Sequence, residues 1–231
     1  MATTRALRYE AKRIVRGARF RLTRRLPVHT PQEGWPGIER VAVESMPFAS
    51  RFGNAKPNEL AVLGAVVKFA RAHTVFEFGT FDGLTTWHLA RNLAPGGRVI
   101  TLDLPLDHPA RARREHDRTV GPVLHGVAVG GVFADTPEAE RITQLLCDSQ
   151  QFDPAPYRGA VDVCFVDASH TYENVKRDSE SALVMTSPGG TVLWHDYSRW
   201  WPGVQRCLDE LSGSLPLFLV DGTSLAALRV P

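Results

Sequence analysis

The stretch VFEFGTFDGLTTWHLA, residues 75–90, decides the fold. A short apolar run leads into a turn that carries Gly79 and Gly83, and residues 84–92 then favour a helix. Glycine at such a turn lets the backbone approach a ligand closely and adopt positive φ. The N-terminus of the following helix offers N–H groups without partners in the helix. A strand, a glycine turn and a helix in this order predict a ligand site at the carboxyl end of a strand in an open α/β sheet.

Outward from this stretch, helical and strand-like segments alternate, which is typical of a Rossmann-like, doubly wound α/β sheet with mostly parallel strands. The run 161–166 is apolar except for Asp162, which indicates a central strand covered on both faces. The stretch 121–140 gives no clear pattern beyond a helical turn at 137–141. The expected helices are 57–70, 84–92, 108–117, 171–185 and 202–211, and the expected strands are 74–78, 99–102, 142–146, 161–166 and 191–194.

The end of the chain differs from the alternating part. The mostly apolar runs 215–220 and 223–230 are separated only by Asp221 and Gly222, a strong signal for a hairpin with a two-residue turn. The sheet is therefore predicted to finish with an antiparallel C-terminal hairpin.

Charge and composition divide the chain into three parts. Nine of the 27 basic residues, but only one acidic residue, fall within 1–25. We therefore expect a basic arm at 1–25, a linker or wrapping segment rich in Pro and Gly at 26–56, and a mildly acidic α/β domain at 57–231. The net negative charge of the α/β domain argues against nucleic acid as a partner.

The basic arm is compatible with several roles. Apolar residues recur at helical spacing over 5–22 and basic residues occupy another face, so this segment can bind an anionic membrane surface or a partner chain. An organelle transit peptide, a solvated helix and a frayed tail are the alternatives. The three cysteines form no CxxC pair, and no apolar run is long enough to span a membrane, so we expect a cytoplasmic protein, membrane-peripheral if the arm binds lipid.

Acidic residues at the strand ends indicate the kind of cofactor. Asp103 follows Gly83 by 20 residues at the end of the next strand, where a carboxylate can accept hydrogen bonds from both ribose hydroxyls of an adenosine cofactor. Asp148 and Ser149, after a further strand, are placed to meet an adenine edge. Asp82 within the glycine turn disfavours a pyrophosphate and suits a cationic sulfonium cofactor better.

The segment 77–83, EFGTFDG, resembles motif I of class I S-adenosylmethionine-dependent methyltransferases. The blocks 148–170, 165–183 and 188–197 are similar to the Methyltransferase domain 24 family, a resemblance that covers roughly residues 57–230. It implies a seven-stranded sheet with an antiparallel last strand and S-adenosylmethionine as cofactor. The residues expected to bind that cofactor, from the motif and the strand ends together, are Glu77, Gly79, Thr80, Gly83, Asp103, Asp148 and Ser149.

A second group of polar residues follows two strands expected to be neighbours. Asp167 and His170 come after one strand, and His195 and Asp196 after the next. A histidine can serve as general base for methyl transfer, so His170 and His195 are candidates, with Asp167 beside them. Asp167, His195 and Asp196 also resemble the magnesium-binding carboxylates of catechol-type O-methyltransferases. With a histidine in the set, manganese, iron or zinc fits at least as well as magnesium.

These residues predict methyl transfer to an oxygen of a small-molecule or glycan acceptor. The first alternative is an NAD-linked oxidoreductase on a related sheet, which Asp82 and the terminal hairpin disfavour. The second is an inactive scaffold recruited by its arm, which the intact acidic residues at the strand ends disfavour. A homo-oligomer is compatible with the sequence.

Overall fold

The computed structural model describes residues 25–45, 51, 53–109 and 126–231. Within them the strands form a single eight-stranded sheet in the order β1-β7-β8-β6-β5-β2-β3-β4. Only β8 runs antiparallel to its neighbours β6 and β7. The strands are β1 (Val28–His29), β2 (Thr74–Phe78), β3 (Arg98–Asp103), β4 (Ile142–Leu146), β5 (Val161–Val166), β6 (Thr186–Trp194), β7 (Phe218–Val220) and β8 (Ala226–Arg229).

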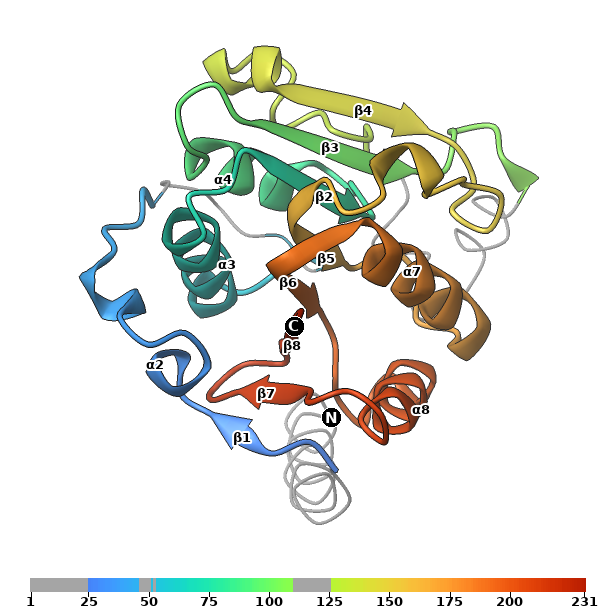
Figure 1. Ribbon diagram of the computed structural model, residues 1–231. Helices are drawn as coiled ribbons and strands as arrows, with labels where there is room; N and C mark the ends of the chain where they lie inside the picture. The colour runs from blue at the N-terminus through green and yellow to red at the C-terminus, as the bar shows by residue number, and fades with distance from the viewer. Residues whose placement is uncertain (1–24, 46–50, 52, 110–125) are drawn as a thin grey trace, which may run out of the picture.

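Helices cover both faces of the sheet (Figure 1). Because side chains alternate along a strand, Val75 of β2 belongs to the core cluster that includes α3 and α4, while Phe76 belongs to the cluster that includes α7 and α8. This is the doubly wound arrangement that the alternating sequence predicts. The helices are α2 (Pro31–Gly34), α3 (Pro57–Phe69), α4 (Leu84–Arg91), α7 (Tyr172–Met185) and α8 (Pro202–Leu211), with 3-10 turns η1 (Ile38–Arg40), η2 (Pro137–Arg141) and η3 (Ala155–Tyr157).

Residues 26–45 pack against the domain and add an eighth strand to the seven expected. β1 pairs in parallel with β7 and becomes an edge of the sheet. Leu26, Trp35 and Ile38 are buried, and the Trp35 indole N–H donates to the Thr191 hydroxyl at 3.3 Å. These residues are therefore part of the core. A short strand that pairs with a distant part of the chain leaves little signal in its own sequence.

The C-terminal hairpin has a longer loop than the sequence predicts. Residues 221–225 lie between β7 and β8, where a two-residue turn was expected. The Ser224 N–H and hydroxyl both donate to the Glu59 carboxylate, and the Tyr197 N–H donates to the Ser224 carbonyl. The loop backbone thus bonds to other parts of the domain and does not close the tighter hairpin.

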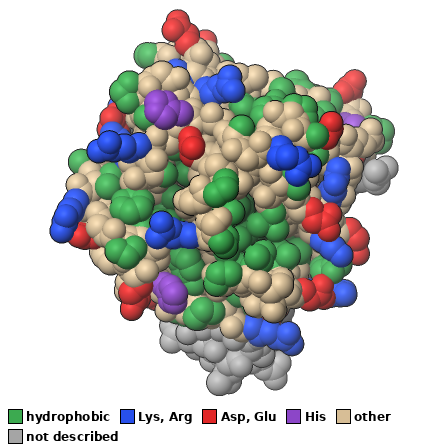
Figure 2. All heavy atoms as spheres, in the orientation of Figure 1, with side chains coloured by type: hydrophobic (Ala, Val, Ile, Leu, Met, Phe, Trp, Pro, Cys, Tyr) green, Lys and Arg blue, Asp and Glu red, His purple; other side chains and the backbone are tan. Residues whose placement is uncertain are grey.

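Two sequence predictions concern residues outside the described ranges. These are the basic helix at 5–22 and most of the expected helix at 108–117. Within the described part of the chain, no helix is long and apolar enough to cross a membrane. On the face seen in Figure 2, hydrophobic side chains gather near the middle and charged side chains of both signs lie scattered around them.

Candidate active site

The glycine turn after β2 is fixed by contacts with its neighbours. The Gly79 N–H donates to the Leu102 carbonyl at 2.8 Å, and the Phe81 N–H donates to Asp103 Oδ2 at 2.8 Å. Gly79 has φ of 97° and Gly83, the residue before α4, has φ of 91°, so both occupy the left-handed region that glycine tolerates. The turn and the end of β3 are therefore held together by hydrogen bonds.

Glu77 lies buried beneath this turn. Its Oε2 accepts hydrogen bonds from the hydroxyls of Thr86 and Thr101, the latter at 2.7 Å, and Thr80 Oγ1 lies 2.8 Å from Thr101 Oγ1. Its Oε1 is buried and has no hydrogen-bond partner among the described residues. Burial raises the pKa of Glu77 to about 8, with the charges of Asp167 and Asp103 adding to the effect of burial.

Residues 126–136 cover the glycine turn, a feature the sequence analysis does not predict. The Gly130 N–H donates to the Phe81 carbonyl at 3.0 Å, and the Val132 N–H donates to the Asp82 carbonyl at 2.8 Å. A Cβ at Gly83 would lie 2.6 Å from the Phe133 ring, so a side chain at this position would displace residues 126–136 from the glycine turn. The glycine pair at 130–131 is the one sequence signal for this loop.

Asp82 and Asp148 are both held by local contacts. Asp82 Oδ1 accepts from the Asn54 amide at 2.9 Å, and Arg51 Nε lies 3.7 Å from Asp82 Oδ2. Asp148 Oδ1 accepts the Gln150 N–H, and Cys147, the residue before it, donates its N–H to the Asp103 carbonyl at 3.0 Å. Asp148 and the buried Ser149 are thereby placed next to the end of β3.

The ends of β5 and β6 bring Asp167, His170 and Asp196 together. One ligand atom from each lies within 4.8 Å of those of the other two. His170 Nε2 is 2.8 Å from Asp196 Oδ2, and the His170 ring stacks on Trp201 with centroids 3.8 Å apart. Asp196 has φ of 61°, which is uncommon for a residue other than glycine and aims its side chain back toward His170.

His195 lies beside this cluster, with Nδ1 3.7 Å from Asp196 Oδ2, so the set of Asp167, His195 and Asp196 expected from sequence also meets in space. Its ring is buried, with Nε2 3.1 Å from Glu59 Oε2 and Nδ1 3.3 Å from Asp167 Oδ1. Both ring nitrogens are thus directed at carboxylates. Burial alone would lower the pKa of His195, but the contacts with Asp167 and Glu59 raise it well above its ordinary value.

Glu59 is a site residue that the sequence analysis missed. Its side chain is fully buried in the first turn of α3. Although burial opposes the charged form, hydrogen bonds from His195 and from the N–H groups of Lys56 and Ser224 hold the pKa of Glu59 far below its ordinary value. The Pro57-Asn58-Glu59 start of a helix is a recognisable capping signal, but it says nothing of a partner 136 residues away.

The aromatic residues near β6 divide into two groups. Trp194 and Tyr197 belong to the core, and the Trp194 indole donates to Ser179 Oγ at 2.8 Å. Trp201 stacks on His170, and Trp200 is 44% exposed beside it in sequence. Trp200 and Trp201 are therefore less enclosed than Trp194 and Tyr197.

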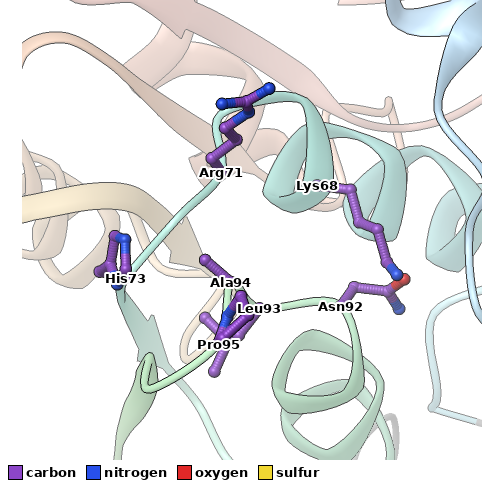
Figure 3. A pocket seen from close by; sticks show the side chains of 7 residues that line it. All are labelled: Lys68, Arg71, His73, Asn92, Leu93, Ala94 and Pro95. Carbon is purple, nitrogen blue, oxygen red and sulfur yellow. The ribbon is translucent and has the colours of Figure 1, made fainter.

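A surface cavity of about 540 Å³ lies away from these strand ends (Figure 3). It is lined by the C-terminal end of α3, the residues before β2 and the loop after α4, at the opposite end of β2 from the glycine turn. Among its cationic groups, Lys68 is paired with Glu44 at 2.9 Å. The cavity is separate from the candidate active site.

The fold and the strand-end residues together define a class I methyltransferase fold. The family model described as Methyltransferase domain (Methyltransf_24) matches residues 76–197, more than half of the chain, and the protein belongs to this family. No curated protein sequence matches the chain significantly.

Solved structures support the same fold. The O-methyltransferase TomG from Streptomyces achromogenes, in complex with SAM, is similar with a TM-score of 0.56 at 19% identity, over 77% of this chain and 82% of that one. An O-methyltransferase from Bacillus cereus, in complex with SAH, gives 0.54 at 19% identity, over 78% and 84%. CalS11, a TDP-rhamnose 3'-O-methyltransferase of calicheamicin biosynthesis, gives 0.51 at 19% identity, over 74% and 78%.

Proposed function

We propose that this protein transfers the methyl group of S-adenosylmethionine to an oxygen of a small molecule or a sugar-containing metabolite. The observation that carries the proposal is the position of the glycine turn next to the Asp167–His170–Asp196 cluster. A Cβ at Gly79 would lie 2.3 Å from the Asp167 carbonyl oxygen, so the two features are in direct contact. The O-methyltransferases with similar folds, two of them with SAM or SAH bound, support the reaction class.

The cofactor end of the site suits S-adenosylmethionine. Glu77 Oε1 is a buried acceptor without a partner among the described residues, and the ligand's ammonium group can satisfy it. The Asp103 carboxylate accepts the N–H groups of Phe81 and Leu104, and a carboxylate at this strand end is the type of group that binds ribose hydroxyls. When bound, the cofactor supplies an electrophilic methyl carbon on its sulfonium.

His170 is the residue best placed to activate the acceptor. When its Nε2–H donates to Asp196, Nδ1 carries a lone pair that can accept a proton. His170 then takes the proton of the acceptor hydroxyl while the oxygen bonds to the methyl carbon and the carbon–sulfur bond breaks, which leaves S-adenosylhomocysteine. The side chain of His170 is 26% exposed, so an acceptor can reach it.

The same three residues suit a divalent metal. Two carboxylates and one imidazole form a donor set for manganese, iron or zinc at least as well as for magnesium. Asp167, His170 and Asp196 would hold the ion, which would acidify and orient an acceptor hydroxyl. A requirement for metal in turnover distinguishes this version from the metal-free base.

Calorimetric titration with S-adenosylhomocysteine, with NAD in a parallel experiment, tests the proposal. We expect micromolar binding of S-adenosylhomocysteine and no binding of NAD. Binding of NAD alone would support the oxidoreductase, and binding of neither would support the inactive scaffold. A screen of catechols, phenols and nucleotide sugars as acceptors, with EDTA or with added Mn²⁺ or Mg²⁺, then tests the acceptor class and the need for metal.

A further inference from the structure

Glu59 is a buried carboxylate whose two oxygens serve different parts of the fold. Oε1 accepts the Ser224 N–H at 2.9 Å and the Ser224 hydroxyl at 2.8 Å, which ties it to the loop between β7 and β8. Oε2 accepts the Lys56 N–H at 2.9 Å and faces His195 Nε2 at 3.1 Å. The Lys56 ammonium adds an ion pair at 3.5 Å to Oε1. Oε2 therefore serves the helix cap and His195 together, while Oε1 serves the loop.

His195 extends this set of contacts into the candidate active site. Its Nδ1 lies 3.3 Å from Asp167 Oδ1 and 3.7 Å from Asp196 Oδ2. The edge of its ring packs against Phe165 with centroids 6.2 Å apart. With a carboxylate on either side and an aromatic ring against it, the imidazole has one favourable orientation.

We propose that Glu59 is a positioning residue, which holds the His195 ring against Asp167 and thereby fixes the Asp167 carboxylate toward His170 and Asp196. This inference rests on the function proposed above, because it assigns Glu59 and His195 to the acceptor side of that site. His195 then orients a neighbour, and His170 is the histidine that contacts the substrate. The packing of α3 and of the 221–225 loop thus determines the geometry at the ends of β5 and β6.

A purely structural role is the competing explanation. Glu59 occupies the third position of α3, where its carboxylate caps the start of the helix by accepting the Lys56 N–H. The two contacts with Ser224 explain how the loop docks on α3. Neither role requires His195, so a test must separate loss of fold from loss of orientation at Asp167.

Glu59→Gln and Ser224→Ala form a matched pair for this test. Gln is nearly isosteric with Glu but has only one acceptor oxygen, so one side of the group, with His195 or with Ser224, loses its acceptor. Ser224→Ala removes the hydroxyl contact with Oε1 and leaves the His195 contact in place. The measurements are crystal structures with S-adenosylhomocysteine, calorimetric affinity for that ligand, melting temperature, and kcat and KM with an acceptor from the screen.

Glu59→Gln is expected to turn the His195 ring away from Asp167 and to lower kcat by roughly tenfold or more, with affinity for S-adenosylhomocysteine within about twofold of wild type. Ser224→Ala is expected to lower the melting temperature and to leave both kcat and the His195 ring unchanged. If Glu59→Gln places its amide nitrogen toward His195 and still keeps the His195–Asp167 contact and the wild-type kcat, Glu59 is only a cap and the proposal is overturned. If its amide oxygen stays toward His195, the His195→Gln variant below decides.

A second variant covers the case in which Glu59→Gln does not fold. His195→Gln leaves the Lys56 and Ser224 contacts of Glu59 in place and is expected to free the Asp167 carboxylate in the same way. An unchanged Asp167 in that crystal structure would overturn the proposal. Failure of the wild type to bind S-adenosylhomocysteine or to methylate any acceptor would instead refute the proposed function, while the two side-chain positions would still decide the role of Glu59.

Discussion

The backbone of Gly79 packs directly on the backbone of Asp167. An added Cβ at Gly79 would lie 2.3 Å from the Asp167 carbonyl oxygen and 2.7 Å from its carbonyl carbon. The Asp167 N–H also donates to the Phe78 carbonyl at 2.8 Å. The turn that we assign to the cofactor and the carboxylate that we assign to the acceptor are therefore joined through the ends of two adjacent strands.

Gly79→Ala should separate these two strand ends. The substitution combines a left-handed φ of 97° with a backbone clash, and we expect it to lower the free energy of unfolding by about 3 kcal/mol. Gly96→Ala is the matched control, because Gly96 has φ of 75° with no atom within 4 Å of its added Cβ. It should cost about 1 kcal/mol. Urea denaturation measures both values, and equal losses would show that the contact with Asp167 is unimportant.

Asp103→Ala should weaken cofactor binding. The substitution removes the acceptor for the Phe81 N–H as well as the charge that we assign to the ribose, so affinity for S-adenosylhomocysteine should fall by roughly tenfold or more. Asp153→Ala removes a carboxylate that accepts the Ala155 N–H in an exposed loop, and it should leave the affinity unchanged. Calorimetry compares the two variants, and an unchanged affinity in Asp103→Ala would contradict the ribose role.

Glu77→Gln should change how stability depends on pH. The pKa of Glu77 rises from 4.5 to about 8 on folding, so the folded state binds a proton more tightly than the unfolded state. The contribution of Glu77 to stability is then complete at low pH and is lost as pH rises from about 5 to about 8, by a total on the order of 4 kcal/mol. Gln has no such titration. The free energy of unfolding of Glu77→Gln relative to wild type should therefore increase over this range and then level off.

Urea denaturation of the two proteins at a series of pH values, without ligand, checks this expectation. Curves of unfolding free energy that stay parallel from pH 5 to 8, within about 0.5 kcal/mol, would mean that the pKa of Glu77 is not raised. The sign is informative as well, because a wild type that gained stability with pH relative to Glu77→Gln would indicate a lowered pKa.

The parts of the fold that local pattern determines are those that the sequence predicts. Strands β2, β4 and β5 begin and end where the apolar runs do, because turns bound each run closely. The short strand β1 is different, because its formation depends on hydrogen bonds with β7, about 190 residues further along the chain. The 221–225 loop likewise depends on the long-range contact between Ser224 and Glu59.

The candidate site follows the same division. Their positions in the sequence predict that Asp103, Asp167, His170 and Asp196 lie at the carboxyl ends of the parallel strands. The structure places them there. The direction of a ring is not a property of strand position. The Nε2 of His195 faces the buried Glu59 while its Nδ1 faces Asp167, and this orientation depends on how α3 packs on the sheet.

Asp167→Asn tests whether the cluster holds a metal. A divalent ion needs a charged oxygen donor, so we expect the wild type to take up an ion after metal supplementation and dialysis, and the variant to bind it at least about tenfold more weakly. Asp162→Asn is the matched control, because Asp162 lies at the opposite end of β5 from Asp167 and accepts the N–H groups of His73 and Thr74. Elemental analysis measures the bound metal. An ion retained by Asp167→Asn would place the metal elsewhere. No ion in the wild type, together with turnover that EDTA does not affect, would leave the His170–Asp196 pair as the base that activates the acceptor.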